Sequence, residues 1–234
     1  MDWWDLVRER LTPAARGGGI TAYGLGAVLL VAAGAAAWEP LWHRLRIIVT
    51  LVHELGHASV GMACGRRFTG FVVRGDASGH AVTVGPSRGF GRVATTWAGY
   101  PAPALAGAAL ITAVVRGHAA PVLGAALVGS ILVATQVRSL LTALVVMLTG
   151  AATGGLWWWR DDAVQTYVAL AASVLLLAGG WRGLANVTRR GRPTDDPAVL
   201  AALTHLPAPV WLLSWLVVNL AASGVAVLAL RAAL

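Results

Sequence analysis

Five consecutive residues in one apolar stretch carry the side chains of a metal site, and they read His53-Glu54-Leu55-Gly56-His57. On a helix with about 3.6 residues per turn, His53 and His57 project from one face and can direct two imidazoles at a single metal ion. Glu54 lies beside that face, where a carboxylate can act as general base on a water molecule. The pattern predicts a catalytic Zn²⁺ ion held by His53 and His57, with Glu54 as the base.

A catalytic zinc ion usually has three protein ligands and a water molecule, so another part of the chain must supply the third ligand. Carboxylates and imidazoles are the ligand types to search for. The candidates are Asp76, Asp161, Asp162, Asp195, Asp196, His43, His80, His118 and His205. At this point the residues leave the choice open.

The composition places the motif in a membrane protein. Hydrophobic residues make up 57% of the chain, charged residues only 12%, and the mean hydropathy is +0.70, which leaves too little polar surface for a soluble globule. All 18 basic residues are arginines, against 10 acidic residues. Most arginines lie between apolar runs, where membrane orientation explains them, so we expect a lipid bilayer and no nucleic acid as partner. The one cysteine, Cys64, is expected to be a packing residue.

Apolar runs long enough to cross the bilayer recur along the chain. They lie at about residues 20–38, 45–65, 93–115, 119–137, 140–159, 163–181 and 209–230. Only Arg138 and Ser139 separate the fourth run from the fifth, and a re-entrant pair or one broken helix would give the same pattern. We interpret Arg138 as a boundary residue, with a functional charge as the alternative. The sequence therefore predicts an all-α polytopic membrane protein with about six or seven transmembrane helices.

The arginines also predict an orientation. With seven spans, most arginines fall on the side of the N-terminus, so the positive-inside rule places residues 1–19 in the cytoplasm and the C-terminus outside, in the plasma (inner) membrane.

Within an apolar span, two imidazoles and a carboxylate are costly unless they are coordinated or face a wet cavity. The alternative is a pH-sensitive polar packing cluster.

A short β-hairpin is expected directly after the predicted metal-binding helix. Residues 68–84 are rich in β-branched side chains on both sides of a polar turn from Gly75 to Gly79. An edge strand of such a hairpin can pair with an extended peptide, which a transmembrane substrate must become before cleavage. The alternative is a connecting hairpin that binds no substrate.

Three stretches resemble the intramembrane zinc metalloproteases of the site-2 protease (M50) family, in their M50B-like branch. They are the HELGH motif with the following Gly65-Arg66-Arg67, the predicted hairpin at 68–84, and Ala98-Gly99-Tyr100-Pro101-Ala102-Pro103-Ala104-Leu105-Ala106-Gly107. The last is similar to the family's Gly-rich helix that packs beside the site. The resemblance covers residues 45–107 and is looser beyond them.

The resemblance also bears on the third ligand. Site-2 proteases generally use an aspartate within an Asp-Gly pair, and this chain has no Asp-Gly pair. The M50B-like branch carries an aspartate before a short helix that ends in Leu-Thr, and Thr194-Asp195-Asp196-Pro197 before Leu203-Thr204 resembles that arrangement. The resemblance thus implies Asp196, or else Asp195, as a ligand. An aspartate before proline is equally typical of a helix N-terminus, so capping stays an alternative.

Together these observations predict one membrane-embedded domain over residues 1–234, with the zinc helix, hairpin and Gly-rich helix at 45–107 and the candidate third ligand in the loop at 182–208. The predicted function is a zinc-dependent intramembrane endopeptidase that cleaves a membrane-anchored protein substrate in or near the bilayer. A non-proteolytic zinc-binding scaffold or a transporter is the alternative, favoured by the missing Asp-Gly pair. The substrate and the oligomeric state stay open.

Overall fold

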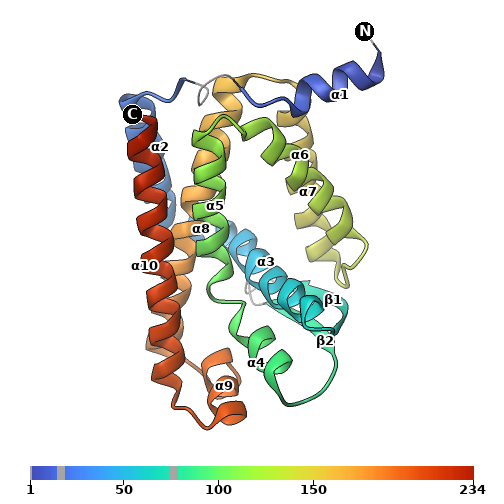
Figure 1. The fold of residues 1–234 in the computed structure, drawn as a ribbon, viewed down its shortest axis with the longest axis vertical. Helices are drawn as coiled ribbons and strands as arrows, with labels where there is room; N and C mark the ends of the chain where they lie inside the picture. The colour runs from blue at the N-terminus through green and yellow to red at the C-terminus, as the bar shows by residue number, and fades with distance from the viewer. Residues whose placement is uncertain (1, 15–18, 74–78) are drawn as a thin grey trace.

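A computed structural model of the chain describes residues 2–14, 19–73 and 79–234. Over these residues the fold is mostly helical, with one small antiparallel sheet (Figure 1). The helices are α1 (Trp3–Leu11), α2 (Ala22–Ala37), α3 (Glu39–Ala63), α4 (Phe90–Trp97), α5 (Ala102–Val115), α6 (Ala119–Ala134), α7 (Leu140–Trp158), α8 (Asp162–Arg190), α9 (Asp196–Thr204) and α10 (Ala208–Ala233). The strands are β1 (Arg67–Val73) and β2 (Gly79–Val84).

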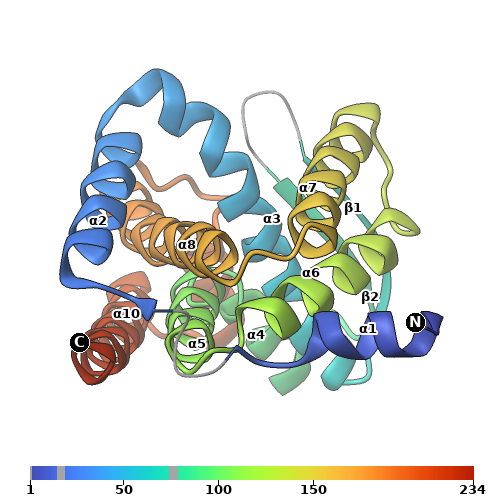
Figure 2. The same ribbon diagram turned by 90° about the horizontal axis from the view of Figure 1, so that it is seen from above.

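Helix α8 is the central element, and α2, α5 and α10 pack around it (Figure 2). Small residues allow α5 and α8 to approach closely. A Cβ added at Gly107 would lie 2.7 Å from the Ser173 carbonyl oxygen, and one at Gly180 would lie 2.8 Å from the Ala104 Cβ. Such contacts hold helices together in a bilayer, where apolar side chains gain nothing by leaving lipid. They fix α5, and therefore the chain just before it, against the centre of the bundle.

The described residues contain three helices that are long and apolar enough to cross a membrane, namely α7, α8 and α10. The number rises to five if two bent pairs each form one span: α2 with α3, bent by 100°, and α4 with α5, bent by 64°. Helix α6 is apolar but shorter. The polytopic α-helical class therefore agrees with the structure, whereas the count of six or seven spans is not confirmed.

The run at residues 93–115, expected as one span, is broken between α4 and α5. Pro101 is the N-cap residue of α5. Proline has no N–H to donate to the preceding turn and its ring crowds that turn, so it favours a break at this position. The break turns residues 98–101 toward α3, with consequences for the metal site.

Both termini lie at the same end of the molecule, whereas α4 and α9 lie toward the other end (Figure 1). The seven-span count had placed the termini on opposite faces. Because the structure contains no membrane, the predicted sides of the N-terminus and the C-terminus stay predictions.

The expected hairpin is present: β1 pairs with β2 in antiparallel register, with Phe71 opposite Ala81. The turn, including the candidate ligand Asp76, lies outside the described residues. The linker between α6 and α7 runs along the outer edge of β1, where the Phe71 N–H donates to the Gln136 carbonyl (3.2 Å) and the Arg138 N–H donates to the Phe71 carbonyl (3.3 Å). Arg138 is exposed in this linker, which agrees with a boundary residue. The outer edge of β1 is thereby covered at Phe71, and β2 lies against α3.

Candidate metal centre

Helix α3 runs unbroken through the motif and holds His53 and His57 on one face. The two rings meet edge to face with their centroids 4.7 Å apart, and their Nε2 atoms lie 3.0 Å from each other. Glu54 follows on the adjacent face and is only 5% exposed. The helical spacing that predicted two convergent imidazoles therefore agrees with the structure.

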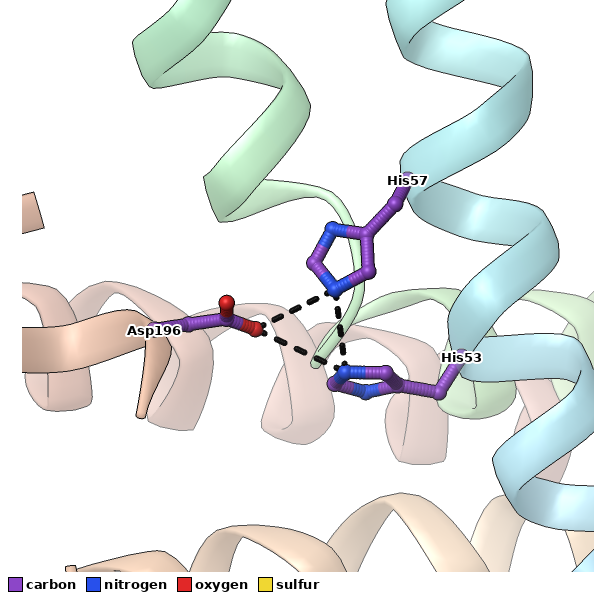
Figure 3. A group of neighbouring side chains, drawn as sticks. All are labelled: His53, His57 and Asp196. Carbon is purple, nitrogen blue, oxygen red and sulfur yellow. Dashed lines mark hydrogen bonds and ion pairs between the residues drawn. The ribbon is translucent and has the colours of Figure 1, made fainter. Parts of the chain in front are cut away.

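Asp196 approaches the two histidines from α9, on the other side of the site from α3 (Figure 3). Its Oδ2 atom lies 3.2 Å from His57 Nε2 and 3.5 Å from His53 Nε2. In a tetrahedral zinc site with bonds of about 2.0–2.1 Å, ligand atoms lie roughly 3.3 Å apart. The three separations in this site, 3.0, 3.2 and 3.5 Å, match the edges of that tetrahedron. The geometry and donor types fit a zinc ion.

A backbone carbonyl fixes the proton on the His57 ring. The Nδ1 atom of His57 lies 2.7 Å from the Thr95 carbonyl oxygen in α4. A carbonyl oxygen can only accept, so Nδ1 must carry the proton and donate. Nε2 is the ring nitrogen that faces His53 and Asp196, and it is therefore the atom available to a metal ion. Most metal-binding histidines are held in this way by a partner at the second ring nitrogen.

The break between α4 and α5 leaves the space that an ion would need. A Cβ added at Gly99 would lie 2.3 Å from His57 Nε2 and 2.7 Å from His53 Nε2, close to where a zinc ion would bind both nitrogens. The backbone of the break lies directly against α3, because an added Cβ at Gly56 would lie 2.6 Å from the Ala98 carbonyl oxygen. Any side chain at position 99 would fill the metal position. Gly99 therefore keeps that position open.

Aromatic rings hold His53 in place. The Tyr100 ring meets the His53 ring edge to face at 4.8 Å and stacks on Trp215 of α10 at 4.5 Å. Trp215 is fully buried, and its indole N–H donates to the Trp97 carbonyl at 3.0 Å. These contacts run from Trp97 through Trp215 and Tyr100 to His53. They connect α10 and the end of α4 to α3. The orientation of His53 is set by packing as well as by its rotamer preference.

The two neighbouring aspartates at the start of α9 have different environments. Asp195 is the N-cap residue but makes no side-chain cap bond, and its Oδ2 instead accepts from the Arg192 N–H at 2.8 Å. Asp196 is the first residue of the helix and faces the histidines. Burial raises the pKa of the Asp196 carboxyl, but hydrogen bonds and positive charge from His53 and His57 outweigh burial and hold that pKa below its usual range. Asp196 is therefore an anion in the position of a third ligand.

The remaining candidates do not join this group. In the part of the chain that the structure describes, the only cluster of three or more His, Cys, Asp or Glu side chains with metal-site spacing is His53, His57 and Asp196. Asp161 caps α8 by accepting from the Val164 N–H, and Asp162 pairs with Arg160. The other histidines lie at the start of α3 (His43), in β2 (His80), before α6 (His118) and after α9 (His205).

Sequence reasoning did not identify three groups in this site: the Thr95 carbonyl, the Tyr100 ring and the backbone N–H of Ala81, which donates to Glu54 Oε2 at 2.6 Å. A backbone group has no sequence signal of its own. Tyr100 had one, because a Gly-Tyr-Pro sequence inside an apolar run is typical of a break. A broken helix exposes backbone and side chains that a continuous helix would direct into lipid.

The comparisons with known proteins give one match. A family model described as Peptidase M50B-like matches residues 26–226. No curated protein and no solved structure matches the chain.

Proposed function

Because the chain belongs to the Peptidase M50B-like family, we propose that it is a zinc-dependent endopeptidase that cleaves a membrane-anchored protein in or near the bilayer. The family implies an intramembrane metalloprotease. The observation that carries the proposal for this chain is the convergence of His53, His57 and Asp196 beside the space at Gly99. A metal ion there would meet two neutral imidazoles and one carboxylate, a ligand set that catalytic zinc commonly has.

Each side chain has a defined task in this proposal. His53, His57 and Asp196 would hold Zn²⁺, whereas Asp195 stabilises the turn before α9. When bound, zinc supplies a Lewis acid that polarises the scissile carbonyl and lowers the pKa of a water molecule. Glu54 takes a proton from the attacking water and delivers it to the leaving amine, so that water adds across the peptide bond. The low exposure of Glu54 keeps bulk water away from this transfer.

The hairpin provides a surface for the substrate. A transmembrane helix must lose its own backbone hydrogen bonds before its peptide bonds are accessible, and pairing with an edge strand replaces them. The outer edge of β1 is covered at Phe71 by the α6–α7 linker, so the proposal relies on the edge of β2 beyond Ala81, whose own N–H binds Glu54. β2 also contacts α3, which carries the proposed base. An extended segment along β2 would therefore pass close to Glu54.

We also propose an orientation. Arg66 and Arg67 follow α3, and Arg189, Arg190 and Arg192 precede α9, so these arginines favour a cytoplasmic location for the metal end. Since both termini lie at the other end, the C-terminus then lies outside, as expected from sequence, and the N-terminus joins it there instead of lying in the cytoplasm. An impermeant thiol reagent should label cysteines placed at either terminus from outside the cell. Labelling of the two ends from opposite sides would contradict this arrangement.

The test separates metal binding from cleavage. We expect His53→Ala and Asp196→Ala to lose bound zinc, and Glu54→Gln to keep zinc but lose proteolysis. Comparing membrane proteins in cells with the wild-type and Glu54→Gln chains would identify the substrate, because its uncut form accumulates with the variant. If Glu54→Gln still cleaves that protein, the proposed mechanism is wrong. If the wild-type chain binds zinc but no membrane protein accumulates in uncut form with Glu54→Gln, a non-proteolytic scaffold or transporter is the better explanation.

A further inference from the structure

The hairpin has a second feature that concerns the base rather than the substrate. Glu54 is a carboxylate in an apolar helix, and such a group is costly to bury without hydrogen-bond donors. Among the described residues, the donor that the structure gives it is the backbone N–H of Ala81 in β2, at 2.6 Å from Oε2. This distance is short for an N–H···O hydrogen bond.

The register of the hairpin explains why this N–H is available. Residues directly opposite each other in an antiparallel pair either exchange both backbone hydrogen bonds or make neither. The N–H and carbonyl of Phe71 both bind the α6–α7 linker, on the side of β1 away from β2. Ala81, opposite Phe71, therefore also directs its N–H away from its partner strand, toward α3. A shift of the register by one residue would remove the donor from Glu54.

Gly79, two residues earlier on β2, makes room for the same carboxylate. A Cβ added at Gly79 would lie 2.5 Å from Glu54 Oε1, 2.7 Å from Glu54 Cγ and 2.7 Å from Thr50 Cγ2. These distances are far below van der Waals contact, so a side chain at position 79 would displace Glu54. Its backbone is in an extended strand, so lack of space and not backbone conformation is what requires glycine here.

We propose that the β2 backbone is part of the catalytic apparatus: the Ala81 N–H positions Glu54 for proton transfer, and Gly79 leaves the space that its carboxylate needs. This inference rests on the proposed function of Glu54 as the base. One carboxylate oxygen is held by the strand, which limits rotation of the side chain and leaves the other oxygen to exchange the proton. The hairpin thus couples the position of the base to the strand on which the substrate is proposed to lie.

Kinetic variants test the role of the donor. Ala81→Pro removes the N–H but no bond of the β1–β2 ladder, because this N–H points away from β1 and proline is tolerated at such edge positions. With a synthetic single-span peptide that carries a fluorophore and a quencher at its ends, we expect kcat to fall about 10- to 100-fold. KM and zinc content should change little. Ala81→Gly retains the donor, so the ratio of kcat between the two variants measures the contribution of the N–H alone.

Gly79→Ala tests the space without removing the donor. We expect it to lower kcat with zinc retained, whereas Gly183→Ala in α8, where an added Cβ meets no atom within 4 Å, should leave kcat unchanged. An unchanged or higher kcat in Ala81→Pro, or equal losses in Ala81→Pro and Ala81→Gly, would overturn the proposal. So would a loss that appears only in KM, because that would assign the N–H to substrate pairing.

Hydrogen exchange tests the contact independently of proteolysis. The Ala81 amide should exchange slowly in the zinc-loaded wild-type protein and faster in Glu54→Ala, which lacks the acceptor. Equal exchange rates in the two proteins would refute the contact. Slow exchange that depends on Glu54 in a protein that cleaves nothing would instead leave the contact intact and contradict the proposed function.

Discussion

Replacement of Gly99 by alanine is the sharpest test of the metal site. The added Cβ would lie 2.3 Å from His57 Nε2, 2.4 Å from His57 Cε1 and 2.7 Å from His53 Nε2. Carbon and nitrogen atoms need about 3.5 Å, so the rings must retreat by roughly 1 Å. Functional zinc sites tolerate only about 0.2 Å in their bond lengths. Changes that merely disturb the partners of ligands lower metal affinity about 10- to 100-fold, so we expect at least about a 100-fold loss for Gly99→Ala.

The measurement is zinc affinity of the detergent-purified protein, by competition with a chelating dye, with helix content followed by circular dichroism. Gly183→Ala is the matched control, because it makes the same change in α8 where an added Cβ has open space. Alanine also favours a helix over glycine by about 1 kcal/mol, so the control should be at least as stable as the wild-type protein. A folded Gly99→Ala protein that binds zinc as tightly as the control would refute the placement of the ion beside Gly99.

Three further predictions concern the ligands and their supports. Asp196→Asn should lower zinc affinity at least about 10-fold, whereas Asp195→Asn, whose carboxylate binds the Arg192 N–H, should keep the metal; equal effects would contradict the choice of Asp196. Tyr100→Phe keeps both ring contacts and should bind zinc normally, whereas Tyr100→Ala should weaken binding about 10-fold, as measured by the same competition assay. Zinc affinity should fall as the pH is lowered, because histidine must be neutral to bind a metal. The Asp196 carboxyl, whose pKa lies below its usual range, stays ionised over this change, so a zinc affinity that does not fall would argue against histidine ligands.

Helical periodicity explains why part of the site was predictable. The i, i+4 spacing places His53 and His57 on one face wherever α3 lies, because both residues belong to one rigid element. The hairpin was predictable for the same reason, since its signal is local. The number of spans was not, because hydropathy sums the apolar character of a run and does not register the 100° and 64° bends that join helices into pairs.

The sequence by itself thus determined that the protein lies in a membrane. It also determined the pair of imidazoles, the neighbouring carboxylate and the strands of the hairpin. All of these depend on composition or on spacing within one element. Only the tertiary structure decided that Asp196 and not Asp195 faces the histidines, that Gly99 leaves the space between them, and that Ala81 donates to Glu54. These contacts join elements distant in the chain. They depend on helix packing and strand register, which no local pattern contains.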